Sequence, residues 1–221
     1  MAGRTFAIGD IHGCHTALAA LLAQLAPTSD DTLVVLGDVV DRGPGSRQVI
    51  DQLLEWQARC RLVFIQGNHE EMMLNALGEG DWSDGWLRYG GAATLVSYAG
   101  GLDQVPPRHV EFLKSGIDYW QTERELFVHA NLEPGVPLER QQVEWLRWTH
   151  LTGREQPSAT GQRVICGHTP QITGIPLQIP GWVGIDTYAC GTGWLTALDV
   201  DTNEYFQARQ SGEKRTGKLL N

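Results

Sequence analysis

The length, composition and charge of this chain are those of a globular protein, and they exclude two classes of partner. Its 221 residues favour one domain with a core large enough to fold without disulfides. The formal net charge of −9 argues against a nucleic-acid surface, which needs a basic footprint. No apolar stretch approaches the roughly 20 residues that cross a bilayer, so we expect no membrane partner.

Cysteine usage and the first residues indicate a compartment. The four cysteines, Cys14, Cys60, Cys166 and Cys190, form no C-x-x-C pair, which favours buried, reduced thiols over a zinc knuckle. The chain runs from Met1 directly into its first apolar segment, which leaves no room for a signal peptide. Because reduced thiols suit the cytoplasm, we expect a cytoplasmic monomer.

Apolar runs and helical periodicities alternate through the first third of the chain. Short β-branched runs predict buried strands at Thr5–Ile8, Thr32–Leu36 and Arg61–Ile65. Helices are predicted after Thr16, after an N-cap at Ser46 and over Glu70–Leu77. This alternation predicts parallel strands joined by right-handed crossovers, with a ligand beyond the carboxyl ends of the strands.

The rest of the chain contains an aromatic segment, then further strands. Residues 81–101 combine tryptophans and tyrosines with glycines and form either a wall of the site or a hydrophobic cluster under a loop. A helix is expected from Pro106 through Leu113. Strands are expected at Glu125–Val128, Arg163–Cys166, Trp182–Ile185, Leu195–Val200 and Glu204–Ala208, the last two forming a hairpin. We expect one catalytic domain over residues 1–209 and a flexible tail over 210–221.

Three glycine-flanked motifs follow the first three predicted strands. They read Gly9-Asp10-Ile11-His12-Gly13, Gly37-Asp38-Val39-Val40-Asp41-Arg42-Gly43 and Gly67-Asn68-His69-Glu70. Residues i and i+2 of an extended segment point the same way, so Asp10 and His12 can hold one cation; the alternative is a turn capped by Asp10. Asp38 is the best candidate to bridge two metals about 3.5–4 Å apart.

Later residues complete a second metal site. Asn68, His129 and His168 each follow a predicted strand, and with Asp38 they can hold the second ion. Mixed nitrogen and oxygen ligands without thiolate fit manganese, iron or zinc. Two such ions would orient phosphate oxygens and lower the pKa of a shared water, so that hydroxide attacks phosphorus in line.

Four more residues are candidates for proton transfer and phosphate binding. We interpret Asp41 and His69 as a general-acid pair that protonates the leaving alkoxide. The planar fork of Arg42 suits two phosphate oxygens, although a surface ion pair is the alternative. Arg147 lies on a predicted helix, where packing and phosphate binding both remain open. No cysteine has an arginine six positions on, which disfavours a cysteine phosphatase.

These motifs resemble the signature of the PPP-type metallophosphatases, which include the serine/threonine protein phosphatases. Val128-His129-Ala130 and Gly167-His168-Thr169-Pro170 extend the resemblance, and residues 141–147 are similar to its bacterial and bacteriophage (lambda-type) branch. The resemblance implies a calcineurin-like α/β fold: a central β-sandwich flanked by helices, with a dinuclear metal site at the strand ends.

The resemblance also implies roles for individual residues. The metal ligands are Asp10, His12, Asp38, Asn68, His129 and His168. By the same match Asp41 and His69 donate the proton, and Arg42 and Arg147 bind phosphate. The implied cofactors are two divalent ions, manganese in the first place, with iron and zinc left open. The sequence departs from the family pattern at Asn131 and Tyr188, which leaves substrate preference open.

Three functions follow from these residues. The first is a metal-dependent phosphoprotein phosphatase that acts on phosphoserine or phosphothreonine, with phosphotyrosine left open, and its partner is a phosphoprotein or phosphopeptide. The alternative is a symmetrical diadenosine tetraphosphate hydrolase, a branch that resembles G-D-L-V-A-R-G and so lacks the acid at Asp41. The third is an inactive metal-binding scaffold. The intact Asp41, with Glu70, favours the phosphoprotein phosphatase.

Overall fold

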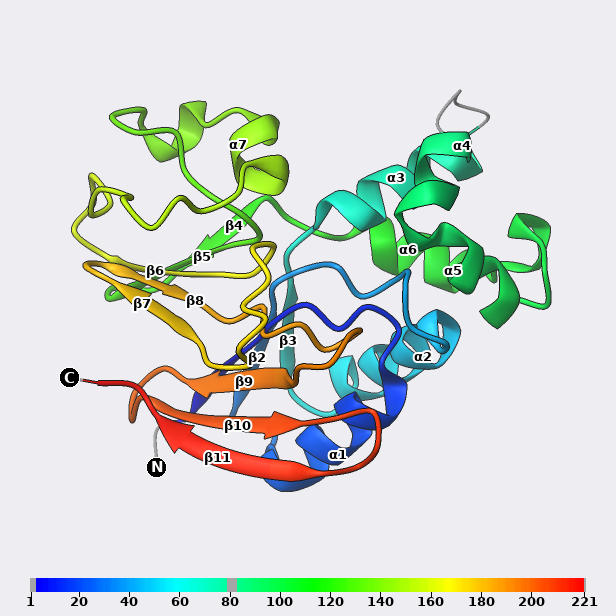
Figure 1. The fold of residues 1–221 in the computed structure, drawn as a ribbon, viewed down its shortest axis with the longest axis horizontal. Coiled ribbons are helices and arrows are strands. Elements are labelled where there is room, and N and C mark those ends of the chain that lie inside the picture. The colour runs from blue at the N-terminus through cyan, green and yellow to red at the C-terminus, as the bar shows by residue number, and fades with distance from the viewer. Residues whose placement is uncertain (1–2, 79–82, 221) are drawn as a thin grey trace.

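Two β-sheets pack against each other in the computed structural model, which describes residues 3–78 and 83–220 (Figure 1). The larger sheet has the order β11-β10-β9-β1-β2-β3, with strands at Lys214–Lys218, Glu204–Ala208, Leu195–Asp199, Thr5–Ile8, Thr32–Val35 and Arg61–Phe64. The smaller sheet has the order β4-β5-β6-β8-β7, with strands at Tyr119–Gln121, Glu125–Val128, Arg163–Cys166, Trp182–Gly184 and Leu177–Ile179. As predicted, β1, β2 and β3 are parallel, and β9 and β10 form an antiparallel pair.

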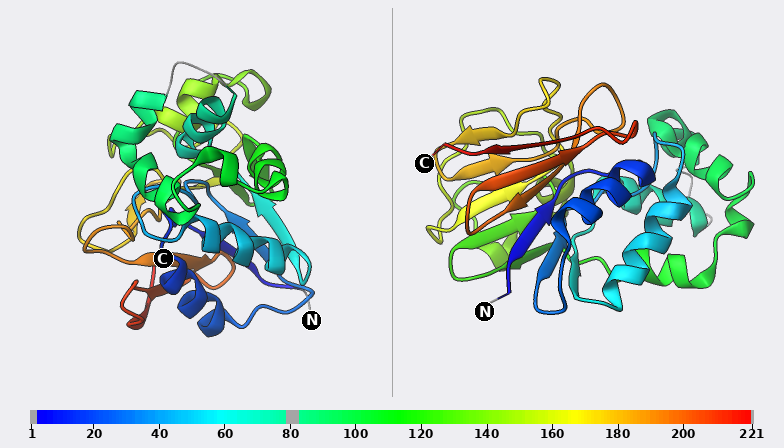
Figure 2. Two further views of the ribbon diagram at one scale, coloured as in Figure 1. Left: turned by 90° about the vertical axis from the view of Figure 1, so that its right-hand side faces the viewer. Right: turned by 90° about the horizontal axis from the view of Figure 1, so that it is seen from below.

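Helices from the first half of the chain gather on one side of the strands, as Figure 2 shows. The longer ones are α1 (His15–Leu25), α2 (Ser46–Gln57), α3 (Asn68–Leu77) and α6 (Pro107–Lys114). Between α3 and α6 lie α4 (Ser83–Trp86), the π-turn η1 (Leu87–Gly91), α5 (Ala92–Ser97) and the 3₁₀ turn η2 (Leu102–Gln104). A 3₁₀ turn η3 (Leu138–Arg140) and α7 (Val143–Trp148) cover the smaller sheet. Every helix in the described residues is too short or too polar to span a membrane.

Alternation along β1 divides the core into two layers. Phe6 and Ile8 pack with the apolar faces of α1 and α2, whereas Ala7 points between the two sheets. Successive side chains of a strand point to opposite faces, so a strand covered on both sides reads as a continuous apolar run. Because both faces are buried, polar side chains that follow these strands emerge only at the strand ends.

The expected flexible tail is wrong for the described residues beyond 209. Lys214–Lys218 forms β11, which pairs antiparallel with β10 along its whole length. Leu219 then packs into the core between the sheets and is 5% exposed. The polar, basic composition of this segment led to the wrong prediction. An edge strand needs only its backbone groups paired, and charged side chains on its outer face are common.

The structure differs from the sequence prediction at the N-cap of α2 and in two additional short strands. α2 begins at Ser46 with Gly45 as its N-cap, so Ser46 is not the cap; its buried hydroxyl accepts a hydrogen bond from the Asp41 N–H at 3.0 Å. The short strands β4 and β7 were not predicted. Of the aromatic segment, residues 81 and 82 lie outside the described residues.

Candidate metal centre

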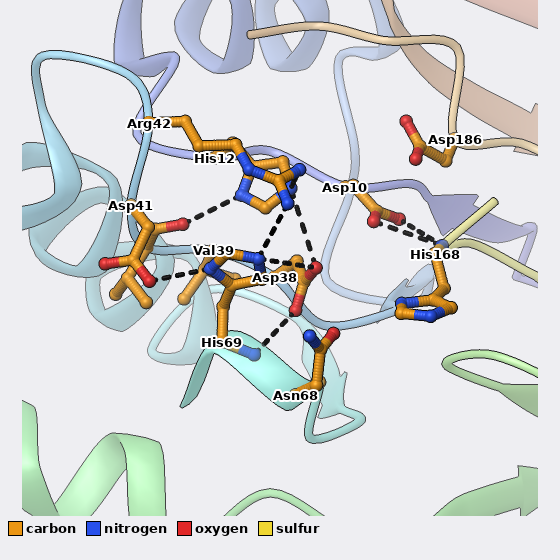
Figure 3. Close-up of polar contacts among 12 residues, drawn as sticks. Asp10, His12, Asp38, Val39, Asp41, Arg42, Asn68, His69, His168 and Asp186 are labelled. Carbon is orange, nitrogen blue, oxygen red and sulfur yellow. Dashed lines mark hydrogen bonds and ion pairs between the residues drawn. The ribbon is translucent and has the colours of Figure 1, made fainter. Parts of the chain in front are cut away.

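Polar side chains from five strand ends converge at one edge of the two sheets (Figure 3). Asp10, Asp38 and Asn68 follow β1, β2 and β3, and His129 and His168 follow β5 and β6. All five side chains are buried. The carboxyl ends of parallel strands meet at the same edge, as the sequence predicted.

Two overlapping groups of side chains have the spacing of metal ligands. His12, Asp38 and His69 place one ligand atom each within 4.8 Å of one another, and so do Asp38, His129 and His168. Asp38 belongs to both groups, which is the position that a bridging carboxylate takes in a two-metal site.

The hydrogen bonds of three histidines show that their inward nitrogens carry lone pairs. A carbonyl oxygen can only accept, so His12 Nδ1, His129 Nδ1 and His168 Nε2 each donate a proton to one: to Val40 at 2.9 Å, Leu36 at 2.6 Å and Trp148 at 3.0 Å. Burial lowers the pKa of all three rings, which favours their neutral form, and in a neutral ring the other nitrogen is unprotonated. Metal-binding histidines are held in the same way, with the second ring N–H bonded to the protein.

Lone pairs consequently face one another in the second group. His129 Nε2 lies 3.2 Å from His168 Nδ1 and 3.1 Å from Asn68 Oδ1. Neither nitrogen carries a proton, so the three atoms repel unless a cation lies among them. These residues therefore fit a divalent metal, and Asn68 falls where the sequence predicted a ligand.

Burial sets the charges of the group. It lowers the pKa of His12 and of His168 to about 3, so both rings are neutral. Burial alone would raise the pKa of Asp38, but the surrounding histidines, His129 foremost, outweigh burial and hold this pKa below its usual value, so Asp38 stays ionised. A neutral His12 and a neutral His168 beside an ionised Asp38 have the protonation states that metal binding requires.

Asp10 occupies the predicted strand end but not the predicted orientation. Its carboxylate accepts hydrogen bonds from the His168 backbone N–H at 3.1 Å, and among the described residues it belongs to neither ligand group. His12 has φ +45°, so the chain is not extended there and the i, i+2 argument is wrong. The ligand role of Asp10 stays a prediction.

The sequence analysis did not identify Asp186 as a residue of the site, nor the hydrogen bonds that Glu70 accepts from the backbone of two motifs. Asp186 follows β8, lies near Asp10 in Figure 3 and is buried, which raises its pKa to about 7. The Glu70 carboxylate accepts the backbone N–H groups of Asp38 (2.8 Å), Val39 (2.8 Å) and Gly67 (2.9 Å), so it ties the second motif to the third. For Asp186 a usable signal existed, because it follows an apolar run as Asp10 and Asp38 do.

The proposed acid pair is assembled, and Arg42 lies across it. His69 Nδ1 donates to Asp41 Oδ2 at 2.7 Å. Arg42 donates from Nη1 to His12 Nε2 at 2.8 Å and from Nη2 to His69 Nε2 at 2.9 Å (Figure 3). A cation held by His12 would compete with Arg42 for the same lone pair.

The segment from α4 to α5 holds Asp41 and Arg42 in place. Trp86 Nε1 donates to both Asp41 oxygens, at 3.0 and 2.9 Å, and the Thr94 hydroxyl donates to Oδ1 at 2.7 Å. The Gly90 carbonyl accepts the Arg42 N–H at 3.2 Å, and a Cβ on Gly90 would lie 2.7 Å from Arg42 Cγ. This segment therefore forms a wall of the site, one of the two arrangements left open by the sequence.

Arg147 is engaged by two carboxylates. On α7, its Nη1 donates to Glu71 Oε2 at 3.0 Å and its Nη2 to Asp118 Oδ1 at 2.5 Å. The side chain is 13% exposed. A phosphate would have to compete with both acids, so phosphate binding by Arg147 stays a prediction.

Comparison with known families and proteins agrees with this geometry. The model of the calcineurin-like phosphoesterases matches residues 3–191. The chain belongs to this family. Its two helix-flanked sheets are the calcineurin-like fold that the sequence predicted.

Curated relatives match a short part of the chain. Symmetrical bis(5'-nucleosyl)-tetraphosphatases from Klebsiella pneumoniae (strain 342) and Salmonella typhimurium (strain LT2) are each 46% identical to it over 71 residues. The match covers 32% of this chain and 24% of each relative. This chain thus spans about a quarter of the length of the curated relatives that it matches.

Solved structures match the whole chain at low identity. One, provisionally assigned as a diadenosine tetraphosphatase, is 22% identical with a TM-score of 0.68, over 100% of this chain and 96% of its own. A cold-active protein-tyrosine phosphatase from Shewanella is 16% identical, TM-score 0.67, over 98% and 80%. A serine/threonine phosphatase from Saccharomyces cerevisiae is 16% identical, TM-score 0.66, over 100% and 81%. They share the fold; the lambda-type branch stays a prediction.

Proposed function

We propose that this protein hydrolyses dinucleoside tetraphosphates symmetrically. The observation that carries the proposal is the 46% identity over 71 residues to enzymes named as symmetrical tetraphosphatases. The sequence analysis preferred a phosphoprotein phosphatase because of Asp41. The similarity instead favours its alternative, the symmetrical diadenosine tetraphosphate hydrolase. In the reaction, water adds to a central phosphorus and the bond to its bridging oxygen breaks. Two nucleoside diphosphates and a proton leave.

Residues of this chain would divide the work. Asp38, His129, His168 and His12 would hold two divalent ions, which when bound neutralise phosphate oxygens and acidify water. Arg42 carries a guanidinium that can exchange its imidazole partners for phosphate oxygens, a stronger charge-assisted pairing. His69, oriented by Asp41, presents Nε2 toward the same space.

A second candidate, phosphoserine or phosphothreonine hydrolysis, is favoured by the intact Asp41–His69 hydrogen bond. A serine alkoxide is a poor leaving group and needs a proton in the transition state. The phosphate oxygen of a leaving nucleoside diphosphate is far less basic and needs that proton less. An assembled acid pair is therefore of most use against a monoester of an aliphatic alcohol.

Side-by-side kinetics test the two candidates. Diadenosine tetraphosphate, a phosphoserine peptide and p-nitrophenyl phosphate would be assayed with added Mn²⁺, with the bound metal measured. We expect the highest kcat/KM for the dinucleotide, with ADP as its sole nucleotide product. A higher kcat/KM for the peptide would replace the proposal by the second candidate, and AMP with ATP would contradict symmetrical cleavage. No turnover by metal-loaded protein would indicate the inactive scaffold.

A further inference from the structure

A cavity of about 420 Å³ lies between α7, the loops before and after it, and β8. Its lining includes Glu133, Trp145, His150, Arg154, Pro157 and Trp182. The volume falls within the roughly 300–1,000 Å³ of small-molecule sites. In Figure 1 this part of the chain lies across the molecule from the wall formed by α4 and α5.

The cavity adjoins the metal centre. His150 lines it, and the ring of His150 packs against the ring of His168 with centroids 4.4 Å apart. His168 belongs to the second ligand group. One imidazole therefore touches both the cavity and a candidate metal ligand, so the cavity lies next to the metal centre.

The lining has the chemistry that a nucleoside uses. Trp182 is 3% exposed and its indole N–H donates to the Gln156 carbonyl at 2.8 Å, so it is a fixed core residue at the base of the cavity with little of its ring face free. Trp145, half-buried on α7, offers a second indole, and flat apolar faces of this kind stack nucleobases. Glu133 can accept from an exocyclic amino group, and Arg154 can pair with phosphate.

We propose that this cavity binds the base and ribose of a nucleotide substrate whose phosphates lie in the metal centre. The inference rests on the proposed function for the identity of the substrate, and it adds the place where one nucleoside half is held. It also explains how a general phosphoesterase centre selects a nucleotide, because a monoester without a base gains nothing from this cavity.

Steady-state kinetics of Trp145→Ala test the cavity. Base–aromatic stacking measured by alanine substitution corresponds to roughly 5- to 150-fold in binding. We expect KM for diadenosine tetraphosphate to rise within that range, with kcat and the turnover of p-nitrophenyl phosphate unchanged. Trp56→Ala, which removes a half-buried tryptophan from α2, is the matched control and should leave both substrates unaffected. Equal losses on both substrates would contradict the proposal.

A second variant and a binding assay separate this proposal from the proposed function. Ala159→Trp fills the cavity from an exposed loop position without removing a core contact, and it should raise the same KM. Saturation-transfer NMR with adenosine on metal-free protein should show contact in wild type and Trp56→Ala, and none in Trp145→Ala or Ala159→Trp. Adenosine contact without tetraphosphate hydrolysis would support the cavity and overturn the proposed function. Tetraphosphate hydrolysis without adenosine contact would support the proposed function and overturn the proposal for the cavity.

Discussion

The metal centre and the cavity beside it meet at His150 and His168 but are built in opposite ways. In the centre, polar side chains are buried at strand ends, backbone carbonyls accept hydrogen bonds from the histidines, and Glu70 accepts hydrogen bonds from the backbone of the motifs. The cavity is lined largely by half-buried or exposed residues of the loops before and after α7. Rigid strand ends fix the geometry of the reacting groups, whereas loops vary at low cost and select the substrate. The comparison implies that chemistry and specificity are separable here.

The largest expected effect comes from removing the Asp38 carboxylate, which both ligand groups share. It tests whether the metal centre alone controls the chemistry. Asp38→Asn keeps the shape of the side chain but takes the negative charge from both ligand groups. We expect loss of bound metal and a fall in turnover on every substrate beyond the roughly 10–100-fold typical of outer-shell changes. Metal analysis and kcat measure this, and Asp201→Asn in an exposed turn is the control. Metal content and activity at wild-type level would show that Asp38 is not a ligand.

The next largest effect concerns the acid pair. His69→Asn should lower turnover of a phosphoserine peptide by about 10²–10⁴-fold, the usual contribution of general acid catalysis. The loss on p-nitrophenyl phosphate should be much smaller, because nitrophenolate leaves without a proton. The ratio of kcat values for the two substrates is the measurement. A loss independent of the leaving group would remove His69 as the proton donor.

A smaller effect is expected where the α4–α5 wall supports the pair. Trp86→Phe removes the donor to both Asp41 oxygens while keeping an aromatic ring. A hydrogen bond to a charged group contributes about 1.5–3 kcal/mol, so we expect kcat to fall by at least about tenfold with KM unchanged. Because Trp86 acts through His69, the double variant with His69→Asn should lose no more than His69→Asn alone. Additive losses would indicate a general structural role.

The smallest effect should come from an ion pair outside both regions, in which Asp31 is buried and Arg4 is partly exposed. Asp31 accepts from the Arg4 guanidinium at 2.6 Å and from two backbone N–H groups, so Asp31→Asn should destabilise the fold by about 1–3 kcal/mol and spare kcat. Burial would raise the pKa of Asp31, but the Arg4 and backbone hydrogen bonds lower it well below its usual value. The folded pKa is depressed, so this stability is present above the unfolded pKa of about 3.9 and is lost as pH falls toward the folded value. Denaturant unfolding at pH 7 and pH 3 measures it; a pH-independent difference would contradict the account.

The convergence of the candidate ligands at one edge could be predicted from the sequence because most of them follow an apolar run. Asp38 and Asn68 lie a few residues beyond strands whose apolar side chains are buried, so we could place their polar side chains at the strand ends. The pairing of Asp41 with His69 followed from the same registers. The orientation of Asp10 could not be predicted, because the left-handed backbone at His12 depends on hydrogen bonds that only the folded chain supplies.

By itself, the sequence determined the parallel β1–β2–β3 unit and the polar groups at its edge, because local apolar runs and glycine-flanked motifs encode both. Tertiary structure alone decided that β11 closes the larger sheet, that Trp86 and Thr94 hold Asp41, and that Trp145 and Trp182 enclose a cavity. Each of these joins residues far apart in the chain. The spacing of apolar residues within one helix or strand does not predict such contacts, because they depend on how separate elements pack.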